Sequence, residues 1–310
     1  MKNHCKHATA IILAAIILIT PGFSVYAEPV LGYSSKTLLK KDGRTFDLRI
    51  AAKQKLYGYD TLQGACANDG FAYFSLFDRN RNKCRIVKIR LKTLDVIKVS
   101  KPLPIYHANN LTYNTKKNLI LATCCQVKDK RAVFIDPEKL TVVSKKDIKL
   151  KSSKKIPKKV VKNYKGFTAI AYNETHDCYV GRLRGNNNVI IFDGNLKPAR
   201  YVTLRGKRSY LLNQGMESVG NYIYDVRSFK GKHRYSMVTI HTMTGRYVGK
   251  MKFAYGKSPG KELECLFHDG DTYYAGFYYT TSQNHDDRWH RAKRYSYIYR
   301  LTDIKGDCPR

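Results

Sequence analysis

The stretch ELECLFHDGDTYYAGFYY, residues 262–279, carries the pattern that decides the fold. It consists of a short apolar run, an Asp-Gly-Asp turn and a second run in which Tyr recurs, which is typical of two antiparallel strands joined by a hairpin. Four earlier stretches repeat this order: QGACANDGFAYFSLF from Gln63, HANNLTYNTKKNLILAT from His107, GFTAIAYNETHDCYVGRL from Gly166 and QGMESVGNYIYDV from Gln214.

The spacing of these repeats indicates the architecture. They start near residues 63, 107, 166, 214 and 262, and further β-type runs follow them, such as CRIVKIRLKTLDVIKVS at residues 84–100. One four-stranded propeller blade occupies about 40–50 residues. We therefore predict an all-β fold, a five-bladed β-propeller of roughly four-stranded blades. A pair of β-sandwiches is the alternative.

The two ends of the repeat region suggest how the propeller closes. The fifth repeat ends early, after YSYIYRL from Tyr295, whereas residues 36–51 contain an unassigned β-type run before the first repeat. An N-terminal strand that completes the last blade would leave no open sheet edge. We expect this closure.

The N-terminal segment predicts the destination of the protein. Residues 1–27 combine Lys2 and Lys6 with an apolar run and end in Val-Tyr-Ala, which is typical of a cleaved secretory signal. A membrane anchor is the alternative, but an apolar run of about 12 residues is shorter than the roughly 20 that cross a bilayer. We expect residues 28–310 to form one secreted propeller domain, with no membrane-spanning segment in the mature chain. Cys usage predicts neither a disulfide framework nor a zinc site, because no Cys-x-x-Cys spacing occurs.

Charge points to the class of partner. The chain has 57 Lys and Arg against 24 Asp and Glu, a formal net charge of +33. With 43% hydrophobic and 12% aromatic residues it is not a disordered polycation. Ten of the Lys lie in an inter-blade insertion at residues 145–165, where we expect a solvated loop that attracts polyanions. Lys154, Lys155, Lys158 and Lys159 are its candidate binding residues.

The repeat openings supply the candidate site. In a propeller the innermost strand of each blade borders the central channel, so Gln63, Asn109 and Gln214 should converge there as binding residues. Glu217 and Glu264 could act as acid and base on a glycosidic bond. His107 could serve as a base. The alternative is that these polar side chains only hydrate the channel and satisfy backbone groups.

A loop in the fifth repeat adds an aromatic candidate. Trp289, the only Trp in the chain, follows Arg288 in the segment TTSQNHDDRWHRAKRYSYIY from Thr280. An exposed Trp with basic neighbours suits stacking on a sugar ring. The same side chain could instead fill the gap between the first and last blades.

The repeats resemble those of secreted five-bladed β-propellers from Gram-positive bacteria and are similar to the helveticin-J type of bacteriocin-like propeller. The resemblance rests on Gln214-Gly215 before Tyr222-Ile223-Tyr224, on Glu262 and Glu264 before a Tyr-rich strand, and on His107-Ala108 before residues 119–122. It implies action at bacterial surfaces, and it carries over no catalytic residues.

Three functions remain open at this stage. The first is a cationic binding protein for an anionic polysaccharide or a teichoic-acid-like polymer, acting as a monomer, with nucleic acid a minor candidate. The second is a glycoside hydrolase or polysaccharide lyase, and the third is a scaffold for another protein. We expect no cofactor and no metal site, although calcium could bind carboxylates at the channel mouth.

Overall fold

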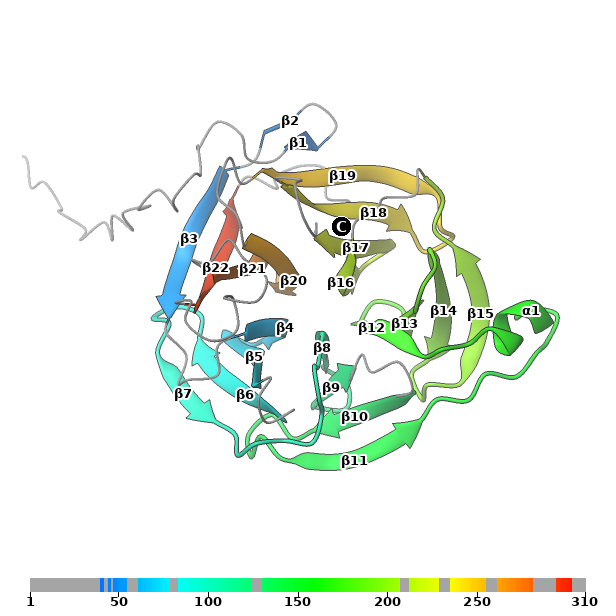
Figure 1. Cartoon of the computed structure of the whole chain (residues 1–310), viewed down its shortest axis with the longest axis horizontal. Coiled ribbons are helices and arrows are strands. Elements are labelled where there is room, and N and C mark those ends of the chain that lie inside the picture. The colour runs from blue at the N-terminus through cyan, green and yellow to red at the C-terminus, as the bar shows by residue number, and fades with distance from the viewer. Residues whose placement is uncertain are drawn as a thin grey trace, which may run out of the picture.

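The computed structural model shows a ring of five four-stranded antiparallel sheets around a central axis (Figure 1). It describes residues 40–41, 44–45, 47–54, 61–78, 83–123, 130–206, 212–228, 235–254, 261–280 and 294–302. The predicted five-bladed propeller is confirmed. The predicted signal segment lies outside the described residues, and among the helices of the described part none is long and apolar enough to cross a membrane.

Blades 1 to 4 each run from an innermost to an outermost strand in chain order. Blade 1 comprises β4 (Thr61–Asn68), β5 (Phe71–Asp78), β6 (Lys83–Arg90) and β7 (Val96–Val99). Blade 2 comprises β8 (Asn110–Asn114), β9 (Leu119–Thr123), β10 (Arg131–Ile135) and β11 (Val142–Asp147). Blade 3 comprises β12 (Phe167–Asn173), β13 (Cys178–Leu183), β14 (Asn188–Asp193) and β15 (Pro198–Thr203). Blade 4 comprises β16 (Leu212–Val219), β17 (Tyr222–Ser228), β18 (Tyr235–Thr242) and β19 (Tyr247–Ala254).

Blade 5 joins the two ends of the described chain. It contains β20 (Lys261–Asp269), β21 (Thr272–Thr280) and β22 (Arg294–Thr302), and its outermost strand is β3 (Asp47–Gln54). Strand β3 pairs antiparallel with β22. The predicted closure is therefore confirmed; the closing strand overlaps the end of the expected range, residues 36–51, and extends three residues beyond it. Two short strands, β1 (Lys40–Lys41) and β2 (Arg44–Thr45), pair with each other just before it.

The turns that the repeats predicted are the hairpins between the first two strands of each blade. In blade 1, Asp69 and Gly70 both have positive φ, 51° and 75°. Two consecutive positive φ angles match a type I′ turn, which follows the right-handed twist of the strands it joins. The Asp-Gly pair is favourable at this position because both residues tolerate such angles.

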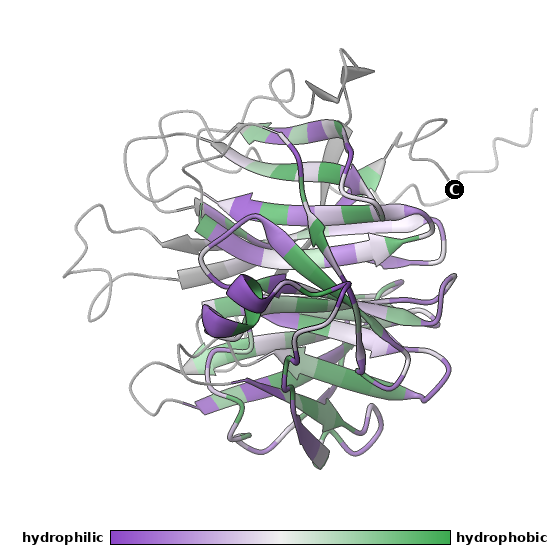
Figure 2. Ribbon diagram, turned by 90° about the vertical axis from the view of Figure 1, so that its right-hand side faces the viewer, coloured by the Kyte–Doolittle hydropathy of each residue, from purple (hydrophilic) through white to green (hydrophobic). Residues whose placement is uncertain are grey.

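The core lies between the blades, in five separate apolar clusters, each built from two neighbouring blades. Successive side chains along a strand point to opposite faces of the blade, so each strand contributes apolar side chains to both faces. In β17, for example, Ile223 packs toward blade 3 and Tyr224 packs toward blade 5. Figure 2 shows the resulting hydrophobic bands across the stacked strands. Burial on both faces of every sheet explains why the repeats are rich in Tyr, Phe, Val and Ile.

Candidate functional site

The five innermost strands all begin at one face of the propeller, which we call the strand-start face. They end at the opposite face in the hairpin turns, and we call this the hairpin face. Neighbouring innermost strands contact one another around the axis, from β4 through β8, β12 and β16 to β20 and back. Side chains at equivalent positions of these strands are therefore brought together.

A β-bulge recurs near the start of the innermost strands. The register with the second strand shifts between Leu62 and Ala65 in blade 1, and the shift recurs at the equivalent position in blades 3, 4 and 5. A bulge leaves a residue out of the ladder and changes the direction of its side chain. The residues at these bulges, together with Asn109 just before β8, form what we call the polar ring: Gln63, Asn109, Thr168, Gln214 and Glu264.

All five members of the polar ring are buried. Asn109 Nδ2 donates to Gln214 Oε1 at 3.4 Å, which links blades 2 and 4 across the axis, and Gln214 Nε2 donates to Ser228 Oγ at 2.9 Å. Within the described residues, Gln63 Oε1 and Thr168 Oγ1 are buried without a hydrogen-bond partner. The ring therefore has unused hydrogen-bonding capacity, which suits a ligand group or ordered water.

The strands at this level approach each other closely. A Cβ added to Gly64 would lie 2.8 Å from Leu111 N, and one added to Gly215 would lie 2.9 Å from Asn110 Oδ1. Asn110 itself donates to Ile170 O and accepts from Met216 N, so it holds three blades together. The Gln-Gly motifs are thus explained: Gln supplies a ring side chain, and Gly lets the next strand approach.

His107 lies beside the ring and orients one of its members. Its Nδ1 is 2.5 Å from Asn109 Oδ1, and its imidazole packs edge-on against the Phe77 ring at 4.7 Å between centroids. The intervening Ala108 has a φ of 39°, which turns both side chains to the same side. Among the described residues no group of three His, Cys, Asp or Glu is placed to hold a metal ion.

The two Glu residues lie at different depths. Glu264 belongs to the polar ring, whereas Glu217 lies beyond the bulge of its strand, opposite Tyr224, and is therefore nearer to the hairpin face. Glu217 Oε1 accepts from Ser218 N at 2.8 Å, and its Oε2 forms an ion pair with His268 Nδ1 at 3.5 Å. Burial alone would lower the pKa of His268, but the contact with Glu217 outweighs it and the pKa is raised. The use of Glu217 and Glu264 as acid and base stays a prediction.

The described Cys residues are packing groups. Cys66, Cys84, Cys178 and Cys265 are all buried, and each packs in or beside an inter-blade apolar cluster. Burial raises the pKa of Cys66, and the nearby Glu217 raises it further. A thiol held neutral in this way is a poor nucleophile. The other Cys lie outside the described residues, and the absence of a disulfide framework stays a prediction.

The Lys-rich insertion is docked on the propeller. It leaves β11 and returns to β12 through the helix α1 (Lys158–Lys162), which lies outside β15 in Figure 1. Three apolar side chains at Ile148, Leu150 and Ile156 are buried in the cluster between blades 2 and 3. The backbone N–H of Tyr201 donates to Lys155 O at 3.0 Å, which ties the insertion to the outer edge of blade 3. The segment connects blades 2 and 3 and is not a freely solvated loop, because these three residues anchor it.

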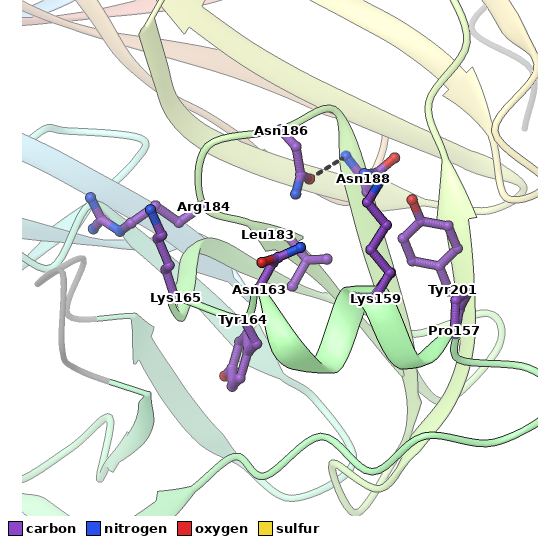
Figure 3. Close-up of a pocket in the computed structure, with 11 residues that line it drawn as sticks. Pro157, Lys159, Asn163, Tyr164, Lys165, Leu183, Arg184, Asn186, Asn188 and Tyr201 are labelled. Atoms are coloured by element: carbon purple, nitrogen blue, oxygen red, sulfur yellow. Dashed lines mark hydrogen bonds between the residues drawn. The ribbon is translucent and has the colours of Figure 1, made fainter.

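A pocket of about 310 Å³ opens between this insertion and blade 3 (Figure 3). Three of its lining residues are basic, Lys159, Lys165 and Arg184, and two are aromatic, Tyr164 and Tyr201. The remaining lining residues are Pro157, Val160, Asn163, Leu183, Asn186 and Asn188. With no acidic residue in this lining, the pocket has the charge and the aromatic faces that suit an anionic sugar.

The predicted binding residues separate into three groups. Gln63, Asn109 and Gln214 meet in the polar ring, as expected. Lys159 lines the pocket, whereas Lys154, Lys155 and Lys158 are exposed on the same insertion without lining it. Trp289 and Arg288 lie outside the described residues. Tyr164, Lys165, Arg184 and Tyr201 were not predicted.

Comparison with known proteins defines the fold and no family. No family model matches the chain, and no curated protein matches it. The tail fibre of Staphylococcus aureus phage P68 is similar in structure, with a TM-score of 0.56 and 12% identity over 86% of this chain. The chain spans only 55% of that tail fibre. Glutaminyl cyclase of Myxococcus xanthus has a TM-score of 0.50 and 11% identity, with 83% of this chain and 97% of the other covered.

Proposed function

We propose that the protein is a cationic β-propeller that binds an anionic polysaccharide or a teichoic-acid-like polymer outside the cell. The observation that carries this proposal is the pocket of about 310 Å³ between the Lys-rich insertion and blade 3. The proposal takes residues 1–27 as a secretory signal, and it places the polymer on the strand-start face.

The pocket has the composition that such a ligand requires. Lys159 and Lys165 are exposed, so their ammonium groups keep their hydration and attract polyanions over long range. Arg184 adds a planar guanidinium that can contact a carboxylate, sulfate or phosphate with two parallel hydrogen bonds. Tyr164 and Tyr201 offer aromatic surface for a sugar ring.

The mode of attachment supports a role beyond solubility. The insertion holds its basic side chains at fixed positions because Ile148, Leu150 and Ile156 are buried beneath it. The Tyr164 hydroxyl also donates to Ile148 O, and the Lys130 ammonium lies 4.8 Å from the Tyr164 ring centroid. A docked basic segment loses less conformational entropy on binding than a free one.

The test is retention of the purified mature chain on immobilised sulfated, carboxylated and phosphorylated polysaccharides at low and high salt. The variant Lys159→Gln/Lys165→Gln/Arg184→Gln should weaken retention roughly tenfold or more at low salt, because three anion contacts are lost. The matched control is Lys92→Gln/Lys139→Gln/Lys197→Gln, which removes the same charge from exposed positions on the hairpin face.

If both triple variants weaken retention equally, the pocket is not the binding site and the polymer is held only by the overall positive charge. Release of soluble fragments is measured in parallel. If the wild-type chain releases fragments, and Glu217→Gln abolishes their release but leaves retention intact, the protein is a polysaccharide-degrading enzyme rather than a binding protein. Binding to a protein partner that added salt does not weaken, with no retention on any of the polymers, would favour the scaffold function.

A further inference from the structure

Two buried arginines at the interface between blades 3 and 4 share a single carboxylate. Arg182 Nη1 lies 2.5 Å from Asp225 Oδ1, and Arg227 Nε lies 2.6 Å from Asp225 Oδ2. The exposed fraction of the side chain is 1% for Arg182, 5% for Arg227 and 0% for Asp225. Arg182 comes from β13 of blade 3, and the other two residues come from β17 of blade 4.

The charges of this cluster do not balance. Two guanidinium groups and one carboxylate leave one positive charge in the interior, and no other acidic side chain contacts either guanidinium in the described part of the chain. The neighbouring His241 does not add to the excess, because burial lowers its pKa to about 4 and leaves it neutral near pH 7. A buried charge without a full counter-charge is costly, and native proteins seldom retain one without a reason.

The hydrogen bonds of the arginines are also incomplete. Arg182 Nε is buried and has no hydrogen-bond partner among the described residues. The other donors of the cluster converge on neutral amides. Asn187 Oδ1 accepts from Arg182 Nη2 at 3.3 Å and from Arg227 Nη2 at 3.1 Å, and Asn213 Oδ1 accepts from Arg182 Nη2 at 3.0 Å.

The position of these amides gives the cluster a route to solvent. Asn187 and Asn213 are half-buried, unlike the charged residues behind them, and they lie at the strand-start face. Asn187 precedes β14 in the turn that also supplies Asn186 and Asn188, two of the residues that line the pocket. A single neutral oxygen thus occupies the position between two guanidinium groups where an anionic oxygen would be bound more strongly.

We propose that Arg182 and Arg227, with Asn187 as a displaceable cap, form a binding site for one oxyanion group: a carboxylate, sulfate or phosphate. The anionic oxygen takes the place of Asn187 Oδ1, contacts Nη2 of both arginines and neutralises the excess charge. This site goes beyond the polymer pocket and does not depend on it, because its donors belong to different side chains.

The test uses a substitution that imitates the bound anion. Asn187→Asp places a carboxylate oxygen between the two guanidinium groups, so it should raise Tm by about 2–4 °C without added ligand. The matched control is Asn221→Asp, with the same charge change at an exposed position on the hairpin face that belongs to neither site. Its Oδ1 contacts only His176 Nε2 among the described contacts, and the substitution should change Tm by about 1 °C or less.

Inorganic sulfate is the probe, compared with chloride at constant ionic strength. In the wild-type chain and in Asn221→Asp, sulfate should raise Tm by about 2–4 °C with saturation. In Asn187→Asp the site is already filled, so less than half of that rise should remain. An equal sulfate response in all three proteins, or equal stabilisation by the two Asp substitutions, would overturn the site.

Two further measurements complete the design. If Asn187→Asp fails to fold, crystals of the wild-type chain soaked in selenate decide the matter, because an anomalous peak must lie within hydrogen-bond distance of Arg182 and Arg227. The source of the anion is tested by polymer retention. If sulfate displaces the polymer more than chloride does in the wild-type chain and not in Asn187→Asp, the oxyanion belongs to the polymer; otherwise it is a free ion. The selenate result does not depend on Lys159 or Lys165, whereas the displacement experiment requires that the polymer is retained.

Discussion

The interface between blades 3 and 4 and the interface between blades 4 and 5 stabilise the ring by different means. Between blades 4 and 5 the cluster includes the rings of Tyr224, Phe253, Phe277 and Tyr299. Between blades 3 and 4 the apolar cluster has no aromatic residue, and Arg182, Asp225 and Arg227 lie next to it. The same blade therefore presents an apolar aromatic face to one neighbour and a charged face to the other.

This difference teaches where specificity and function can be placed in a repeat fold. Neighbouring blades could pack in more than one register if every interface between them were equally apolar. A buried ion cluster that only one pair of blades can satisfy favours one register. The same cluster holds the donors for the anion site proposed above, so the less apolar interface is also the one with ligand-binding chemistry.

The largest effect should come from removing one charge at the interface between blades 3 and 4. Asp225→Asn keeps the shape of the side chain but leaves both arginines without a carboxylate, and it should lower the free energy of unfolding by about 3–5 kcal/mol. At the other interface, deletion of a whole ring in Phe253→Ala is needed for a loss of about 3–5 kcal/mol. Urea unfolding measures both.

The control for the charge change is Asp95→Asn, at an exposed position, which should alter the free energy of unfolding by about 0.5 kcal/mol or less. If Asp225→Asn lowers the free energy of unfolding by less than about 1 kcal/mol, the buried ion cluster does not stabilise this interface as proposed.

Acid should weaken the interface between blades 3 and 4 through His241. Burial lowers its pKa to about 4, from about 6.5 for an imidazole in the unfolded chain. The unfolded chain therefore binds a proton at this residue more readily than the folded chain, and stability is lost as pH falls from about 6.5 toward 4. A difference of about 2.5 pKa units corresponds to roughly 3 kcal/mol.

The measurement is the pH dependence of urea unfolding for the wild-type chain and for His241→Gln. The variant should lose less stability than the wild-type chain between pH 7 and pH 4. Parallel curves would show that His241 is not responsible.

Alkali should weaken the interface between blades 4 and 5, by a smaller amount, through His268. The raised pKa of His268 means that its ion pair with Glu217 contributes stability below about pH 6.5, and that this contribution is lost as pH rises through the folded-state pKa. In His268→Asn the decline on the alkaline side should disappear. A variant that shows the same decline as the wild-type chain would assign it to other groups. The two interfaces thus respond to pH in opposite directions.

The fold was largely predictable because its signals are local. Gln63-Gly64 and Gln214-Gly215 recur at the start of innermost strands, and the Asp-Gly and Gly-Asn turns mark the hairpins. These motifs gave the blade count, the closure by an N-terminal strand and the convergence of the polar ring.

The pocket and the buried arginines could not be predicted because their partners are distant in sequence. Arg182 and Asp225 are charged residues within apolar strands, 43 positions apart, and nothing near either residue indicates the other. The anchors Ile148, Leu150 and Ile156 follow no helix or strand period among the surrounding Lys, so the docking of the insertion was missed.

The closure of blade 5 by β3 has a consequence for biosynthesis. The strand at residues 47–54 is made before every blade, yet its partner at residues 294–302 is made last. During translation its backbone donors and acceptors lack the neighbouring strand with which they pair in the folded ring. Such an edge can template pairing with another chain. The ring therefore closes only after β22 has been synthesised, and correct folding requires that β3 stays unpaired until then.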